Sequence, residues 1–167
     1  MPFIEQELLY RQFKLDEPWD SENNKKLLPY MPNIYKMSDP TRSQERSGCF
    51  YQVFVGPGAA FETTGRPQGQ FGPEGPRMTD FLDGTANTLL IVEAAEAVPW
   101  TKPADLSYDP RRPLPKLGGS YEDVFLVALA DGSVQWAKRT VSEQTLHALI
   151  TRNGGEAVGN DWKFIKR

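Results

Sequence analysis

The apolar positions of the chain follow helical spacing near both ends and form strand-like runs between them. Apolar side chains at helical spacing predict one amphipathic helix over residues 3–15. These side chains are those of Ile4, Leu8, Leu9 and Phe13. Pro18 ends the pattern. Asp20 or Ser21 then caps a second short helix, which ends at Pro29.

Three runs in the middle of the chain have the composition of β-strands. Residues 50–55 are aromatic and β-branched, whereas residues 88–93 are apolar on both faces, which predicts a central strand for the second run. Residues 124–137 predict a hairpin with Asp131-Gly132 as its two-residue turn. Such a turn requires a positive φ at both central positions, and these two residue types tolerate it best.

A closing helix is predicted over residues 142–152. Thr140 and Glu143 stand at the spacing of a capping box, and Gly154 belongs to a glycine pair that favours a left-handed helix stop. The apolar stripe of this helix consists of Leu146, Leu149 and Ile150.

These elements predict a single α+β domain over residues 1–167. We expect an antiparallel sheet of about four strands, covered by the N-terminal and C-terminal helices, because these helices are the amphipathic elements available to bury its apolar faces. Residues 38–48, 56–79 and 98–119 predict loops, the last two long and rich in glycine and proline. Recognition is expected on these long loops, since loops on a rigid sheet usually carry it.

Composition and charge exclude several classes of protein. The chain has 167 residues, 39% of them apolar, with 19 basic and 22 acidic side chains, so there is no basic surplus to hold nucleic acid. Its single cysteine excludes an intrachain disulfide, and one cysteine with one histidine cannot build an ordinary zinc site. Residues 1–5 show no leader, which predicts either a cytoplasmic protein or a targeting segment removed ahead of Met1.

Oxygen-bearing side chains are the first candidates for chemistry. Asp80, Asp83 and Asn87 lie close together in sequence with Glu93, a donor set that calcium accepts, although a polar turn explains them without metal. Glu93 and Glu96 are candidates for a carboxylate pair in a hydrolase, against the simpler interpretation of solvated carboxylates at a strand end.

The remaining candidates have simpler structural interpretations. His147 has no nucleophile motif beside it and is expected at the surface or at the boundary of the core. Cys49 is expected to be a buried free thiol. The tryptophans suit either a core or a sugar-stacking surface, and Trp100 and Tyr108 are expected to anchor the second long loop by packing. The tryptophans are Trp19, Trp100, Trp136 and Trp162.

Several stretches, taken in order, resemble one bacterial family. They lie at residues 15–21, 55–61, 83–93, 97–103, 129–134 and 148–156, and include Asp-Gly-Thr-Ala-Asn-Thr and Leu-Ala-Asp-Gly-Ser-Val. This ordered set resembles the prepilin-type family of unknown function that carries a His-x9-Asp-Gly signature. The present chain has Tyr121 at the position of the signature histidine, ten residues before Asp131.

The resemblance implies a pilin-like or pseudopilin-like domain at the cell surface, joined to the membrane only through an N-terminal helix missing here. It implies a non-enzymatic role in subunit assembly or envelope interactions, with the chain itself or related pilin-like subunits as partners and no cofactor. The alternative is an envelope module that binds a glycan or another small ligand through aromatic residues near the proline-rich loops. A truly leaderless relative would instead be cytoplasmic.

Overall fold

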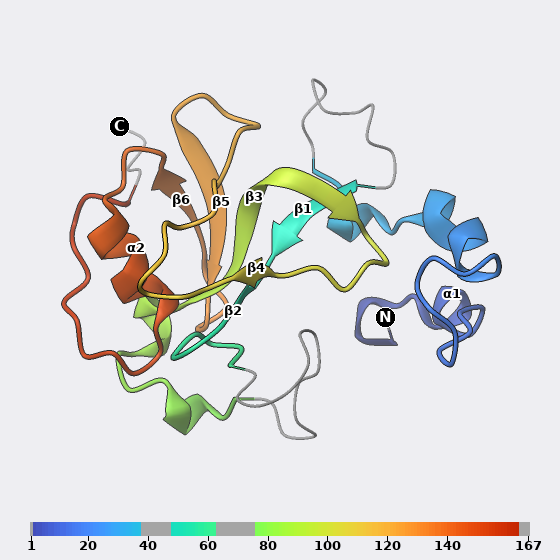
Figure 1. Cartoon of the computed structure of the whole chain (residues 1–167), viewed down its shortest axis with the longest axis horizontal. Coiled ribbons are helices and arrows are strands. Elements are labelled where there is room, and N and C mark those ends of the chain that lie inside the picture. The colour runs from blue at the N-terminus through green and yellow to red at the C-terminus, as the bar shows by residue number, and fades with distance from the viewer. Residues whose placement is uncertain (1, 38–47, 63–75, 164–167) are drawn as a thin grey trace. The chain divides into compact units, whose positions relative to one another are not determined.

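The protein is described here by a computed structural model that covers residues 2–37, 48–62 and 76–163 (Figure 1). The chain divides into two compact units. Unit 1 comprises Met1–Phe50 and Glu96–Ala104, and unit 2 comprises Tyr51–Ala95 and Asp105–Arg167. The prediction of a single domain stays a prediction, since two such units can belong to one domain. The mixed α+β class with a four-stranded antiparallel sheet is confirmed.

The sheet has the strand order β1-β3-β5-β6. Its strands are β1 (Gly48–Gln52), β3 (Leu89–Pro99), β5 (Val124–Leu129) and β6 (Val134–Lys138). The strand predicted over residues 88–93 is β3, which lies between two neighbours as its apolar character on both faces indicated. It continues to Pro99, so it ends immediately before Trp100.

The predicted hairpin is confirmed, but its turn differs from the expected one. β5 and β6 pair antiparallel, with Val127 opposite Gln135. Gly132 has φ 84°, while Asp131 does not share the positive φ. The Gly132 amide donates to the Leu129 carbonyl at 2.9 Å, so a type I turn precedes the glycine. The loop is therefore one residue longer than a two-residue Asp-Gly turn.

The strand predicted over residues 50–55 is divided between two sheets. β2 (Phe54–Val55) leaves the main sheet and pairs in parallel with β4 (Leu106–Ser107), which lies in the second predicted loop. The Tyr108 amide donates to the Val55 carbonyl at 2.9 Å. A Cβ atom at Gly56 would collide with the carbonyl of Tyr108, so this close approach requires glycine.

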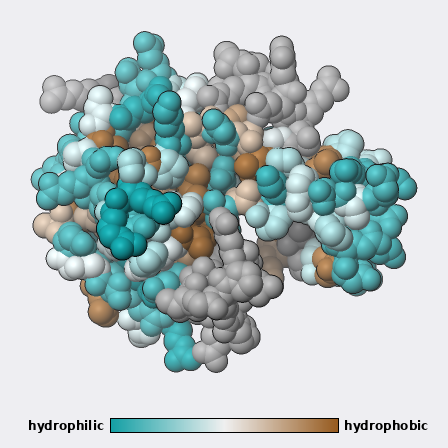
Figure 2. Space-filling model, in the orientation of Figure 1, coloured by the Kyte–Doolittle hydropathy of each residue, from teal (hydrophilic) through white to brown (hydrophobic). Residues whose placement is uncertain are grey.

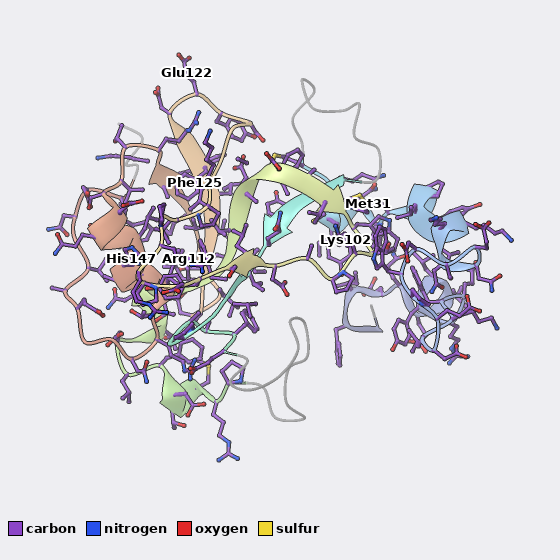
Figure 3. All side chains as sticks on the ribbon, viewed as in Figure 1. Met31, Lys102, Arg112, Glu122, Phe125 and His147 are labelled. Carbon is purple, nitrogen blue, oxygen red and sulfur yellow. The ribbon has the colours of Figure 1, made fainter. Side chains whose placement is uncertain are left out.

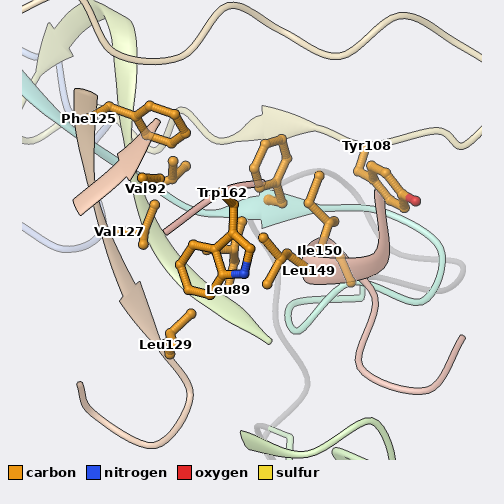
Figure 4. Packing of buried hydrophobic residues seen from close by; sticks show 12 residues of the cluster. Leu89, Val92, Tyr108, Phe125, Val127, Leu129, Leu149, Ile150 and Trp162 are labelled. Atoms are coloured by element: carbon orange, nitrogen blue, oxygen red, sulfur yellow. The ribbon is translucent and has the colours of Figure 1, made fainter. Parts of the chain in front are cut away.

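The core of unit 2 forms between one face of the sheet and helix α2 (Glu143–Ile150) (Figure 4). Phe125 and Val127 alternate with partly exposed residues along β5, and both, like Val92 of β3, are 2% exposed or less. Leu149 of α2 and Trp162 complete the same cluster. The closing helix thus covers the sheet as predicted.

The ends of α2 are fixed by residues other than those predicted. The N-cap is Ser142, whose hydroxyl accepts the Thr145 amide at 3.3 Å, so Thr140 is not the cap. The helix ends at Ile150, and the next residue is already extended, so Gly154 does not provide the stop. The sequence pattern was misleading at both ends because serine and threonine lie close together there and because the Gly154 amide binds elsewhere, to Asp83.

The predicted N-terminal helix is largely wrong. Only Glu7–Tyr10 is α-helical, as α1, and none of its residues is buried. Glu5 has φ 59°, which separates α1 from the 3-10 helix Pro2–Ile4. Leu8 is 81% exposed, and the core cluster of unit 2 contains no residue before Phe54. A helix of one turn is marginal in water, and α1 has no continuous apolar stripe of the length that was predicted.

Other predictions are confirmed in part or lie outside the described residues. The second short helix is present as the 3-10 helix Asn24–Tyr30, and Ser21 accepts the Asn24 amide. Residues 38–47 and 63–75, most of two predicted loops, lie outside the described residues. Within the described ranges, no helix is both long enough and apolar enough to cross a bilayer.

Glu93 holds a loop against the central strand β3 through hydrogen bonds. Its side chain is fully buried in β3, and its carboxylate accepts the Leu126 amide at 3.0 Å and the Ser120 amide at 3.3 Å. Its own carbonyl accepts the Gly118 amide at 2.8 Å. These bonds tie residues 118–126 to β3, because a buried carboxylate must be satisfied by donors.

The substitution Glu93→Gln tests this role. The carboxamide replaces one acceptor oxygen by a donor that faces a backbone N–H, so we expect a loss of about 1–3 kcal/mol in the free energy of unfolding by urea denaturation. Glu122 points away from the protein in Figure 3 and is exposed, so Glu122→Gln is the matched control, with a change of roughly 0.5 kcal/mol or less. Equal stability of the two variants would contradict the assignment.

Asp161 predicts a pH dependence of stability. Its carboxylate accepts the Thr145 hydroxyl at 2.7 Å and the Ser142 amide at 2.9 Å, and these bonds lower its pKa from 3.8 to about 2. A carboxyl whose folded-state pKa is depressed stabilises the fold above its unfolded pKa and loses that effect as the pH falls through the folded value. We expect Asp161→Asn to lower the melting temperature at pH 7, with a difference from wild type that vanishes between pH 4 and pH 2. Asp123→Asn, at an exposed carboxylate, is the control, and a difference that persists unchanged at pH 2 would refute the prediction.

Candidate functional site

Unit 1 contains a pocket whose lining is almost entirely aromatic. Its volume is about 220 Å³. The lining residues are Tyr10, Phe13, Tyr35, Trp100 and Thr101. They come from α1, the segment after it, the 3-10 helix Asn33–Tyr35 and the residues that follow β3. All five are partly exposed, so the rings remain open to solvent while packing on one another.

Trp100 is the fixed centre of this aromatic pocket. Its indole Nε1 donates to the Leu28 carbonyl at 2.9 Å, which sets the orientation of the ring. Tyr35 stacks on it with 6.1 Å between ring centroids, and Phe13 meets it edge-on at 5.7 Å. Stacked and edge-to-face contacts are the preferred geometries of aromatic pairs, so each ring restrains the next. β3 ends at Pro99 and so delivers Trp100 to this position.

Asn24 fixes the chain beside Phe13. Asn24 is 2% exposed. Its Oδ1 accepts the Lys14 amide and its Nδ2 donates to the Lys14 carbonyl, both at 3.0 Å, as the backbone of a neighbouring β-strand would do. The same Nδ2 donates to the Pro18 carbonyl at 2.9 Å. A buried amide satisfied on both sides fixes the loop, and with it the ring that precedes Lys14.

Two of the residues that line the aromatic pocket, Thr101 and Tyr35, carry hydroxyl groups. The Thr101 hydroxyl oxygen is buried and, within the described part of the chain, has no hydrogen-bond partner. Burial raises the pKa of Tyr35, and the neighbouring Cys49 raises it further, so the Tyr35 hydroxyl stays protonated at neutral pH and can donate. The described lining therefore presents mainly aromatic ring faces, the apolar part of a small-ligand site.

The structure does not assemble a cation site from the calcium candidates. Asp80 Oδ2 accepts the Arg77 amide at 2.8 Å, and the two oxygens of Asp83 accept the Gly154 and Gly155 amides at 2.7 and 2.9 Å. Asn87 donates to the Asp83 carbonyl. Across residues 2–37, 48–62 and 76–163, no three His, Cys, Asp or Glu side chains gather in a way that could hold a metal ion.

The acid–base candidates are placed in structural contacts. Glu93 is bonded to backbone amides as described above, and Glu96 is exposed. His147 lies at the boundary of the core, as predicted, with its Nδ1 3.0 Å from the Tyr108 hydroxyl. Burial, followed by Glu156 and Asp109, raises the pKa of Tyr108. Cys49 is buried, also as predicted, and as the one cysteine of the sequence it forms no intrachain disulfide.

The four tryptophans serve different purposes. Trp162 belongs to the core of unit 2, and Trp136 lies on the opposite face of the sheet. Tyr121 packs edge-to-face on Trp136, with 4.9 Å between the ring centroids. In unit 1 the Lys102 ammonium lies 5.9 Å from the centre of the Trp19 ring. Trp100 alone of the four lines the pocket.

Most of the aromatic pocket was missed by sequence reasoning. Trp100 was expected to be a packing anchor, whereas Phe13 was assigned to the apolar stripe of a helix and Tyr35 was given no role. One local signal could have found them: these aromatic residues lie only a few positions from prolines or from the ends of helices. Rings at such positions have no regular element of their own to pack on. Their convergence on Trp100 depends on contacts between distant segments, which spacing along the chain does not show.

Comparison with known proteins identifies the family of this chain. Residues 1–161 match the family described as a protein of unknown function, DUF1559. No curated protein matches the chain, and no solved structure matches it either. Because the family match covers nearly the whole sequence, the chain belongs to the DUF1559 family.

Proposed function

We propose that this protein is a non-enzymatic binding domain of the bacterial envelope, and that the aromatic pocket is its ligand site. The observation that carries the proposal is the arrangement of aromatic rings around Trp100, held by the Leu28 carbonyl. Concave sites lined by aromatic side chains with a few polar groups are the usual form of small-ligand sites. The location in the envelope is supported by the resemblance to prepilin-type proteins.

Binding is favoured over catalysis by the placement of the ionisable groups. Catalysis by a general acid or base requires a titratable group within reach of a substrate. Glu93 is enclosed and bonded to backbone amides, and His147 is engaged by Tyr108. Among the residues that the structure describes, those lining the aromatic pocket include no carboxylate, imidazole or thiol. A role in recognition fits this composition better than a hydrolase centred on Glu93.

The outer face of the sheet favours assembly as a second candidate function. Directly paired residues of adjacent strands share one face, which places Ile91 beside Ala128 and Ala128 beside Val134. Ile91 is 38% exposed and Val134 is 63% exposed, and Trp136 lies next to them, so this face presents apolar area to solvent. On the one side of the molecule that Figure 2 draws, apolar residues are scattered among polar ones. We propose that copies of this chain, or related subunits, contact one another through the outer face of the sheet. This mode of assembly does not require a long N-terminal pilin helix.

Ligand titration tests the aromatic pocket. We expect a saturable change in tryptophan fluorescence with at least one fragment from a panel of envelope polysaccharides. The substitution Tyr10→Ala removes one ring of the pocket from a helix with no buried residue, and we expect it to weaken that binding about tenfold.

Tyr121→Ala is the matched control, since it removes an aromatic ring from unit 2. We expect this variant to bind with wild-type affinity, while thermal unfolding shows that both variants remain folded. A flat response of the wild-type protein across the whole panel would exclude the pocket as a glycan site. Equal losses of affinity in the two variants would show that the ligand does not bind specifically in the aromatic pocket.

Sedimentation tests assembly through the sheet face. If the face mediates contacts between copies, the protein sediments as an oligomer at high micromolar concentration, and Val134→Asp returns it to the monomer because a charge is costly to bury. Leu82, 77% exposed and outside the sheet, provides the control variant Leu82→Asp, which stays oligomeric. If the wild-type protein is still a monomer at its solubility limit, self-assembly through the sheet face is excluded.

A further inference from the structure

We propose that Asn153-Gly154 is a modification site, where the chain deamidates without an enzyme, and that Asp83 keeps this site unreactive in the folded protein. The site lies in unit 2, in the segment that follows α2, so the inference is independent of the aromatic pocket. Asn153-Gly154 is the one Asn-Gly pair of the sequence, and both residues are exposed. Exposure alone would leave the pair reactive, and the contacts of its backbone decide whether it reacts.

Deamidation at an Asn-Gly pair begins with an attack by the backbone nitrogen of the glycine. The Gly154 nitrogen forms a bond to Cγ of the Asn153 side chain and gives up its proton, while the side-chain nitrogen leaves as ammonia. The product is a cyclic imide, and water opens it to aspartate or to isoaspartate, depending on which carbonyl it attacks. Glycine favours the first step because it has no Cβ atom to hinder the approach of its nitrogen.

Asp83 engages the attacking nitrogen in a different contact. Its Oδ2 accepts the Gly154 amide at 2.7 Å, and its Oδ1 accepts the Gly155 amide at 2.9 Å. The Asp83 amide donates to the Arg152 carbonyl at 3.1 Å, so this one residue is bonded to the chain on both sides of Asn153. In Figure 1 the green segment ahead of β3 lies next to the red segment that follows α2.

These hydrogen bonds oppose the reaction in two ways. The Gly154 nitrogen becomes nucleophilic as its proton departs, and the neighbouring carboxylate disfavours the negative charge that this step creates. The attack also requires the backbone to rotate toward the Asn153 side chain, which breaks charge-assisted hydrogen bonds to both glycine amides. Losing bonds of this strength slows a reaction roughly tenfold to a hundredfold.

The residue ahead of Asn153 is also held in place. The Arg152 amide donates to the Gly58 carbonyl at 2.8 Å, and its guanidinium donates to the Glu62 carboxylate at 2.7 Å. Asn153 therefore lies between two neighbours that other segments hold. The rotation that the reaction needs is not a local adjustment, because it requires a junction of three segments to open. The junction consists of residues 58–62, 81–84 and 151–155.

The product of the reaction weakens the junction that prevents it. A Cβ atom at Gly154 would collide with Glu156 Oε2, so the Glu156 carboxylate lies against this backbone. Deamidation replaces a neutral carboxamide by a carboxylate and adds a negative charge near those of Asp83 and Glu156, which repel it. Isoaspartate also lengthens the backbone ahead of the Gly154 amide. The reaction is therefore slow while the junction is closed and promotes further opening once it has occurred.

Peptide mapping by mass spectrometry during prolonged incubation in mildly alkaline buffer tests the proposal. It measures the fraction of Asn153 that is converted to aspartate or isoaspartate. We expect conversion to be roughly tenfold to a hundredfold faster in Asp83→Ala than in the wild type. Asp80→Ala is the matched control, since Asp80 is an exposed carboxylate that accepts the Arg77 amide, and this variant should react at the wild-type rate.

Two further measurements separate local protection from unfolding. Wild-type protein unfolded in urea should react at least as fast as Asp83→Ala. Asp83→Asn keeps one acceptor oxygen and loses the charge, so we expect an intermediate rate, while thermal unfolding shows that this variant stays folded. The proposal is overturned if the native wild type reacts as fast as the urea-unfolded chain. It is equally overturned if the Asp83 variants react at the wild-type rate or more slowly, and a slower rate would make Asp83 a base that assists the reaction.

Discussion

The hydrogen bond from the Trp100 indole to the Leu28 carbonyl is the interaction on which the functional interpretation depends. It holds a large aromatic ring at the end of β3 in one orientation, where Tyr35 and Phe13 pack on it. Because both neighbouring rings pack on Trp100, the orientation of this one indole influences the shape of the pocket. A ring fixed before the ligand arrives loses little conformational entropy on binding, which is the main advantage of a preorganised site.

Several carboxylates of this protein accept hydrogen bonds from backbone amides. Glu93 accepts amides from residues 118–126, Asp83 accepts those of a glycine pair, and Asp161 accepts the amide of the α2 N-cap. Segments rich in glycine and proline leave amides without ladder partners, and buried or partly buried amides must find acceptors. This requirement explains why the acidic residues that the sequence marks as candidates for metal binding or catalysis have structural partners instead.

Elements defined by local pattern could be predicted, whereas those that depend on distant contacts could not. The hairpin of β5 and β6, the central position of β3 and helix α2 follow from alternation, apolar runs and helical spacing. The helical pattern of residues 3–15 was misleading because a positive φ at Glu5 interrupts it and because Phe13 packs on Trp100 rather than on a sheet. Asn24, which fixes the chain beside Phe13, carries no signal in the sequence, since a buried asparagine looks like any turn residue.

Hydrogen exchange of the Trp100 indole N–H, followed by NMR in the ligand-free protein, tests the central claim most directly. An indole bonded to the Leu28 carbonyl in a preformed pocket should give one resonance, and its N–H should exchange slowly. We expect the indole N–H of Trp136 to exchange much faster, because this side chain is 37% exposed on the outer face of the sheet. Exchange of both indoles at the rate of an unfolded chain would show that the anchor does not form, and the account of the pocket would then be wrong.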